Sequence, residues 1–125
     1  MLEDQKKVIV VDDESDILEA IQVMLEDAGY SVLTRERGED LEQLVESTLP
    51  DLILLDMLLS GEDGREITMC LRNQEETKAI PIIMMSAHPS AAQAARDCGA
   101  SDFIAKPFDL DDLLEKIAQN LVPTS

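Results

Sequence analysis

Polar side chains stand directly after several short apolar runs in this 125-residue chain. Asp12 and Asp13 follow one run, Asp56 follows a second, Ser86 a third and Lys106 a fourth. Carboxylate oxygens bind hard divalent cations, while an ammonium group and a hydroxyl stabilise the charge of a phosphoryl group. Together these residue types favour Mg²⁺-assisted phosphoryl chemistry, provided that the fold brings them to one place.

The segments between these residues predict a fold that does so. Strands are expected at residues 8–11, 30–35, 52–55, 81–85 and 101–105, and stretches of helical period separate them. Such alternation predicts right-handed crossovers onto a parallel sheet with helices on both faces, which is a three-layer α/β sandwich. Ligands in such sheets bind outside the carboxyl ends of the strands, where the polar side chains stand.

The repulsion among the carboxylates of the predicted cluster indicates that a cation binds there. Three carboxylates about 5 Å apart, at an effective dielectric near 20, repel one another by roughly 3 kcal/mol per pair. Lys106 offsets one negative charge of the Asp12, Asp13 and Asp56 set, and Mg²⁺ would offset two more. A phosphorylated aspartate would then be neutralised by the ion, by Lys106 and by the Ser86 hydroxyl. The strand at 30–35 ends at Glu36-Arg37 and is expected at the outside of the sheet.

This set of residues resembles the receiver domain of two-component response regulators, the chemotaxis-receiver type. The resemblance is carried by Asp12-Asp13, Asp56, Ser86 and Lys106-Pro107, and it extends over one domain, residues 1–125, with a core of about 6–122. It implies the flavodoxin-like (βα)5 sandwich with strand order 2-1-3-4-5.

The resemblance also implies a role for each residue. Asp56 would accept a phosphoryl group from a phosphohistidine on a sensor histidine kinase or a histidine phosphotransfer protein. Asp13, Asp56 and the Met57 backbone carbonyl would hold Mg²⁺, and Asp12 would act mostly through bound water. Lys106 would contact a phosphoryl oxygen and the Asp56 carboxylate.

A conformational switch is implied as well. Ser86 would move to hydrogen-bond the phosphoryl group, Phe103 would turn inward, and Lys106-Pro107 would form a cis peptide bond. The surface of the fourth helix, fifth strand and fifth helix would then repack. That change would control the binding of a downstream protein or effector domain, including dimerisation that depends on phosphorylation.

Three positions depart from the common family pattern. Ser60 stands where the loop after the phosphoacceptor often has proline, which predicts a less rigid loop. Leu58 and His88 lie two positions beyond Asp56 and Ser86, where family members modulate the access of water to the acyl phosphate.

Other functions fit the sequence less well. A Mg²⁺-dependent phosphohydrolase of the haloacid-dehalogenase type needs a second aspartate two residues after its nucleophile, and Leu58 stands there. A nucleotide-binding domain needs a glycine-rich phosphate loop after the first strand, and none follows residues 8–11. The chain is therefore predicted not to be an enzyme, although it would promote its own phosphorylation and dephosphorylation. A receiver-like scaffold that binds partners without being phosphorylated stays open as an alternative.

Several other polar residues have simpler explanations. His88, the sole histidine, is expected to be exposed, because no second histidine or cysteine has ligand spacing with it. Asp109, Asp111 and Asp112 are explained by helix capping and the helix dipole. Cys70 and Cys98 are predicted to pack in the interior.

Charge and hydropathy limit the partners and the compartment. The chain has 27 acidic against 10 basic residues and a formal net charge of −17, which argues against direct binding to nucleic acid or anionic membranes. No signal peptide is recognised and the apolar runs are too short to span a bilayer, so a cytoplasmic protein is expected. The chain is expected to be either a stand-alone receiver or a receiver cut from a longer regulator or hybrid kinase.

Overall fold

The computed structural model describes residues 5–59, 62–88 and 90–121, and its centre is a five-stranded parallel sheet. The strands are β1 (Lys7–Val11), β2 (Ser31–Arg35), β3 (Leu52–Asp56), β6 (Ile82–Ser86) and β7 (Asp102–Ala105). Their order across the sheet is β2-β1-β3-β6-β7, and every neighbouring pair is parallel. Since β6 and β7 are the fourth and fifth strands of this sheet, the predicted order 2-1-3-4-5 is confirmed.

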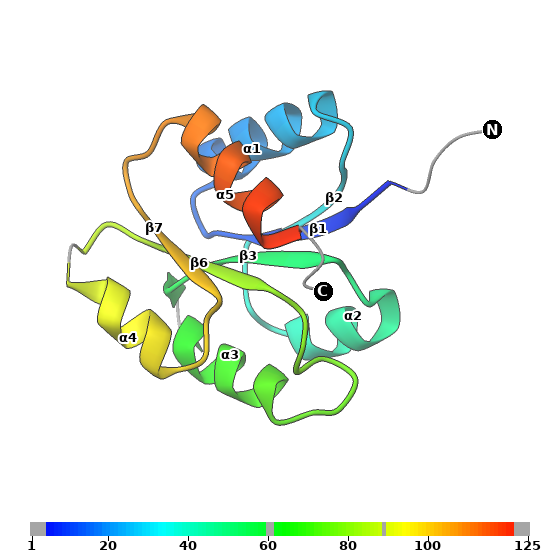
Figure 1. Ribbon diagram of the computed structural model, residues 1–125, viewed down its shortest axis with the longest axis vertical. Helices are drawn as coiled ribbons and strands as arrows, with labels where there is room; N and C mark the ends of the chain where they lie inside the picture. Colours follow the sequence, from blue (N-terminus) through cyan, green and yellow to red (C-terminus); the bar gives the residue numbers. More distant parts are fainter. Residues whose placement is uncertain (1–4, 60–61, 89, 122–125) are drawn as a thin grey trace.

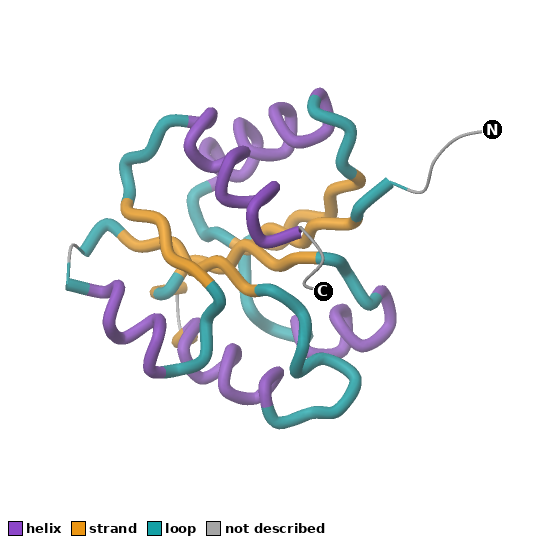
Figure 2. Tube along the Cα trace, in the orientation of Figure 1, coloured by secondary structure: helices purple, strands orange, loops and turns teal. Residues whose placement is uncertain are grey.

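Helices cover both faces of the sheet. They are α1 (Ser15–Asp27), α2 (Leu41–Thr48), α3 (Gly64–Arg72), α4 (Ala91–Asp97) and α5 (Leu110–Leu121). Figure 1 shows α1 and α5 on one side of the sheet and α2, α3 and α4 on the other. Figure 2 shows the strands as the middle layer of this sandwich. The predicted three-layer α/β architecture is confirmed.

The central strands are apolar throughout because each of their faces meets a helical layer. Ile9, Ile53 and Ile82 belong to a buried cluster with side chains of α2, α3 and α4. Their neighbours Val8 and Leu52 belong to a second buried cluster, which includes side chains of α1 and α5. Burying one such side chain stabilises the fold by about 1.5–3 kcal/mol, so both faces hold the strands in place.

Two glycines follow the ends of helices. Gly29 follows the end of α1 and Gly99 follows the end of α4, and both have φ of +103°. This left-handed region is adopted without strain by a residue that lacks a Cβ atom, which is why glycine is favoured there.

The structure also departs from the sequence predictions. A two-stranded antiparallel ladder, β4 (Leu58–Leu59) with β5 (Glu62–Asp63), occupies part of the segment predicted as a loop. The predicted interior position of Cys70 is wrong, since this residue is exposed, whereas Cys98 is buried. The prediction for Ser60 falls outside the described residues.

None of the helices in the described residues combines the length and the apolar character needed to cross a bilayer.

Candidate functional site

The carboxyl edge of the sheet gathers the side chains predicted to form the site. Asp12 follows β1, Asp56 ends β3, Ser86 ends β6 and Lys106 follows β7. Asp12, Asp56 and Ser86 are buried, with exposures of 0%, 7% and 4%. Because these four strands are neighbours in the sheet, residues that are distant in the chain become adjacent at its edge.

The Lys106 ammonium is the centre of this group. Its Nζ lies 2.6 Å from Asp12 Oδ2, 3.4 Å from Asp56 Oδ2 and 3.5 Å from Glu14 Oε1. The short contact with Asp12 is a charge-assisted hydrogen bond, the strong class of such bonds. Glu14 was not among the predicted site residues, and the signal that could have indicated it is its position directly after Asp12-Asp13.

Burial and charge together set the ionisation of Asp56. Burial and the nearby Asp12 carboxylate raise its pKa, while Lys106 and a hydrogen bond from the Leu58 amide lower it, and the result is a pKa of about 6. A carboxyl group with this pKa is mostly ionised at pH 7, so its oxygens are available as nucleophiles or ligands.

Lys106 is held in its charged form. Burial alone would lower the pKa of its ammonium group, but the hydrogen bond to Asp12 and the charges of Asp56 and Asp12 raise it above its usual value. The site therefore keeps one fixed positive charge at physiological pH.

Three carboxylates form a candidate metal centre. Asp12, Asp13 and Asp56 each offer an oxygen, and these oxygens lie within 4.8 Å of one another. Hard oxygen donors of this kind fit Mg²⁺, which uses few carboxylates and keeps several waters. Asp12 Oδ2 already accepts from Lys106 and its Oδ1 accepts from the Glu14 amide at 2.9 Å. This double engagement fits a contribution of Asp12 through water.

The loop after Asp56 is fixed by backbone contacts. The Met57 amide donates to the Met85 carbonyl, and the Met57 carbonyl accepts from the Gly64 amide, both at 2.8 Å. A Cβ atom on Gly64 would lie 2.5 Å from the Asp56 carbonyl oxygen, so the approach of α3 requires glycine. One lone pair of the Met57 carbonyl remains for a metal ion, and that role stays a prediction.

The residues predicted to switch lie beside the site. Ser86 Oγ accepts a hydrogen bond of 3.0 Å from the His88 amide. Phe103 is partly buried against the cluster under α2, α3 and α4. The Lys106–Pro107 peptide bond is cis. His88 is exposed, with its Nδ1 2.9 Å from Ser90 Oγ, and Leu58 is 63% exposed.

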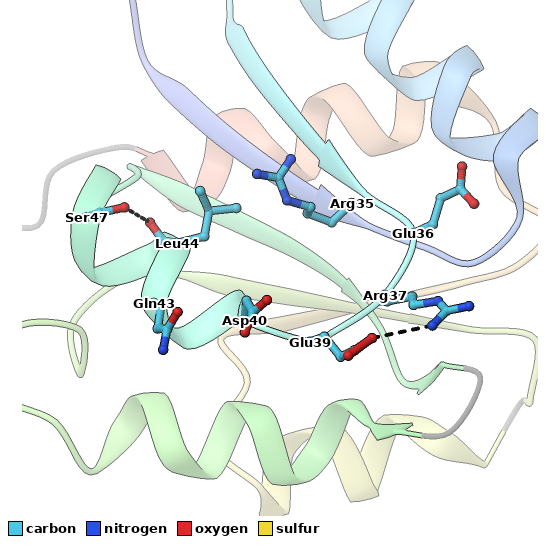
Figure 3. A pocket seen from close by; sticks show the side chains of 8 residues that line it. All are labelled: Arg35, Glu36, Arg37, Glu39, Asp40, Gln43, Leu44 and Ser47. Carbon is cyan, nitrogen blue, oxygen red and sulfur yellow. Dashed lines mark hydrogen bonds and ion pairs between the residues drawn. The ribbon is translucent and has the colours of Figure 1, made fainter.

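The end of β2 lies outside this group. A surface hollow of about 610 Å³ adjoins it, shown in Figure 3. Its lining residues are Arg35, Glu36, Arg37, Glu39, Asp40, Gln43, Leu44 and Ser47. The lining does not include Asp12, Asp56 or Lys106, and Arg37 pairs instead with Glu39 at 3.4 Å. As predicted, β2 is an edge strand of the sheet. The polar residues at its end do not belong to the carboxylate cluster.

Comparisons with known proteins agree with the fold and with the resemblance found in the sequence. The family model described as "Response regulator receiver domain" matches residues 8–118. A protein assigned as a response regulator in Chloroflexus aurantiacus is 32% identical, with a TM-score of 0.90 and coverage of 94% of this chain and 98% of that chain.

Two further solved structures are similar. The chemotaxis response regulator CheY4 of Vibrio cholerae is 29% identical, with a TM-score of 0.88 and coverage of 94% of this chain and 100% of that chain. The receiver domain of NtrX from Brucella abortus is 31% identical, with a TM-score of 0.83 and coverage of 91% and 97%. In a longer NtrX structure the match spans 26% of that chain.

Proposed function

The chain belongs to the response regulator receiver domain family, and from this premise we propose that Asp56 accepts a phosphoryl group from a phosphohistidine of a partner protein. Receiver domains are signalling domains of two-component systems, whose partners are histidine kinases and downstream effectors. The observation that carries the proposal is the position of Asp56, a carboxylate that is buried yet mostly ionised and lies 3.4 Å from the Lys106 ammonium.

Asp56 is the nucleophile of the proposed reaction. One of its carboxylate oxygens forms a bond to phosphorus, the phosphorus–nitrogen bond of the phosphohistidine breaks, and the imidazole leaves with the electron pair. Mg²⁺ held by Asp12, Asp13 and Asp56 would supply positive charge for the phosphoryl oxygens. The Asp56 carboxyl group then carries the phosphoryl group as an acyl phosphate.

Lys106 and Ser86 stabilise the added charge. The ammonium of Lys106 is shared between Asp12 and Asp56 before the reaction, so it is already beside the carboxyl group proposed to be phosphorylated. The Ser86 hydroxyl can donate to a phosphoryl oxygen once it rotates away from the His88 amide. Both contacts would stabilise the negative charge of the phosphorylated carboxyl group.

The movement of Ser86 gives the reaction a structural output. When its hydroxyl leaves the His88 amide, the connection between β6 and α4 loses one restraint. Phe103 is only partly buried and lies on β7, the strand next to β6. The surface of α4, β7 and α5 is therefore the proposed switching face, which would control a downstream partner or phosphorylation-dependent dimerisation.

Labelling with a small phosphodonor tests the proposal. Wild-type protein, Asp56→Asn and the exposed control Asp97→Asn are incubated with acetyl phosphate and Mg²⁺ and analysed by intact mass spectrometry. We expect one added phosphoryl group on the wild type and on Asp97→Asn, and none on Asp56→Asn.

Other outcomes of the labelling experiment would contradict the proposal or indicate a different function. Labelling of Asp56→Asn would contradict the assignment of the phosphoacceptor. Sustained release of phosphate over many turnovers would indicate a phosphohydrolase instead. Absence of labelling on all three proteins, with no uptake of beryllofluoride, would support a scaffold that is not phosphorylated.

A further inference from the structure

Glu14 has a side chain that its position in the fold does not explain. The residue is the N-cap of α1, where a side chain commonly accepts a hydrogen bond from the first turn of the helix. Glu14 makes no such bond, and its Oε1 lies 3.5 Å from Lys106 Nζ instead. Its carboxylate therefore belongs to the charge cluster of the site and not to the helix.

Glu14 is the outermost carboxylate around Lys106. The side chains of Asp12, Asp56 and Lys106 are 0%, 10% and 11% exposed, whereas that of Glu14 is 61% exposed. Lys106 does not depend on Glu14 for its position, because the much shorter contact with Asp12 holds the ammonium. Glu14 is therefore the solvent-exposed carboxylate among the three that contact Lys106.

The charge of Glu14 is close enough to act on a phosphodonor at Asp56. The Glu14 and Asp56 oxygens both contact Lys106 Nζ, so they are within about 7 Å of each other, less than the screening length of about 8 Å at physiological salt. Of the three carboxylates that share this ammonium, only Glu14 lies at the rim of the site, where it adds negative charge. Anionic donors are repelled by such a rim, and positively charged groups are attracted.

We propose that Glu14 is a specificity-determining residue that selects phosphodonors by charge. It disfavours small anionic donors and favours a donor that presents positive charge beside the phosphoryl group, such as a phosphohistidine flanked by basic side chains on a protein. The inference rests on the proposed function of Asp56 as phosphoacceptor.

Two small donors that differ in charge separate this effect from a general change in reactivity. With acetyl phosphate, an Asp56 oxygen bonds to phosphorus while the phosphorus–oxygen bond to the acetyl group breaks and acetate leaves. With phosphoramidate, whose nitrogen is protonated at neutral pH, the phosphorus–nitrogen bond breaks and ammonia leaves. Phosphoramidate carries one net negative charge fewer than acetyl phosphate.

The test measures initial rates of Asp56 phosphorylation with each donor and Mg²⁺ for the wild type, Glu14→Gln, Glu14→Asp and Glu14→Lys. Glu26→Gln is the matched control, since it removes the same charge about 18 Å farther along α1. Exposed charge pairs are worth little, so we expect Glu14→Gln to raise the acetyl phosphate rate about two- to five-fold. The phosphoramidate rate should rise less.

The variants and the salt dependence define the outcome. The acetyl phosphate rate of Glu14→Lys should exceed that of Glu14→Gln, whereas the rates of Glu14→Asp and Glu26→Gln should resemble that of the wild type. These differences in rate should vanish near 1 M salt, where the screening length is about 3 Å. An unchanged ratio of the two donor rates in Glu14→Gln would overturn the inference while the phosphoacceptor role stands. Failure of both donors to label wild-type Asp56 would overturn the proposed function, and the inference with it.

Discussion

Asp56 carries its negative charge at a cost to the folded protein. Its pKa is about 6 in the folded state, against 3.8 for an exposed aspartate, and burial is the main cause. Between these two pH values the folded state binds more protons than the unfolded state does. The contribution of Asp56 to stability is therefore most favourable in acid and declines as the pH rises through about 4 to 6.

The first prediction at the scale of single residues concerns Asp56→Asn. The amide has nearly the same shape and no charge, so the variant should be more stable than the wild type at pH 7 by up to about 3 kcal/mol. The gain should shrink towards zero near pH 4, where the wild-type carboxyl group is protonated in the folded state. Urea unfolding at both pH values measures it, with Asp97→Asn as the control. Equal gains at the two pH values would contradict this account of the Asp56 charge.

Residues of the site differ in how far the sequence could predict them. Asp12, Asp56, Ser86 and Lys106 stand immediately after apolar strands or at their last position, and parallel pairing then fixes where they meet. The contact of Glu14 with Lys106 depends on the direction of one exposed side chain across a separation of 92 residues. Strand patterns carry no information about such a direction, and the only signal in the sequence is the position of Glu14 directly after Asp12-Asp13.

At the scale of elements, the site depends on the start of α3 as much as on the strands. The first residue of α3, Gly64, is buried and donates its amide to the Met57 carbonyl. The preceding residue, Asp63, caps the helix by accepting from the Arg65 amide at 2.9 Å. The antiparallel pair of β4 and β5 lies between Asp56 and this helix start, so the position of the loop after Asp56 is set from both ends.

The prediction at this scale is made for Gly64→Ala. The added Cβ would lie 2.5 Å from the Asp56 carbonyl oxygen and 3.1 Å from the Met57 carbonyl oxygen, so α3 or the loop must move. We expect the free energy of unfolding to fall by about 1–3 kcal/mol, as in overpacked interiors, and the affinity for Mg²⁺ to fall with it. Urea unfolding and Mg²⁺ titration measure the two effects.

The control for that substitution lies on the same helix. Cys70 is exposed on α3, so Cys70→Ala should leave both stability and Mg²⁺ affinity close to those of the wild type. If Gly64→Ala bound Mg²⁺ as tightly as Cys70→Ala does, the contact between α3 and the Asp56 loop would have no role in the metal centre.

The elements themselves were predictable to different degrees. Long apolar strands such as β3 and helices with a buried stripe such as α1 gave a clear pattern in the sequence, because their burial imposes it. The pairing of Leu58 with Asp63 and of Leu59 with Glu62 joins strands of two residues, too short to show any period. The prediction that Cys70 lies in the interior was wrong because residue type alone does not determine which side of α3 the residue occupies.

At the scale of the whole molecule, the net charge of −17 is a source of self-repulsion. Some of the few basic residues contact backbone carbonyls or buried carboxylates, so they do not neutralise the acidic surface. Arg72 donates to the carbonyl oxygens of Gly99, Lys78 and Ile80, and Lys106 is almost buried in the site. The remaining cations cannot balance 27 acidic side chains.

The corresponding prediction is that salt stabilises the protein. Because screening weakens repulsion between exposed charges more than it weakens the buried contact of Lys106 with Asp12, the free energy of unfolding at pH 7 should rise with NaCl. Urea unfolding without divalent cations at increasing NaCl measures this effect. A fall in stability with salt would mean that attractive surface pairs outweigh the repulsion.

The contacts of Lys106 also have a consequence for the order in which the site is built. Lys106 meets Asp12 across 94 residues and Asp56 across 50, and it follows β7, the edge strand that joins the sheet through β6. During synthesis the aspartates emerge long before their counter-charge does. A nascent chain that has paired β1 with β3 holds two facing carboxylates with no ammonium between them. The Asp56 carboxylate therefore gains its counter-charge only when β7 joins the sheet, and the proposed phosphorylation would require that final strand.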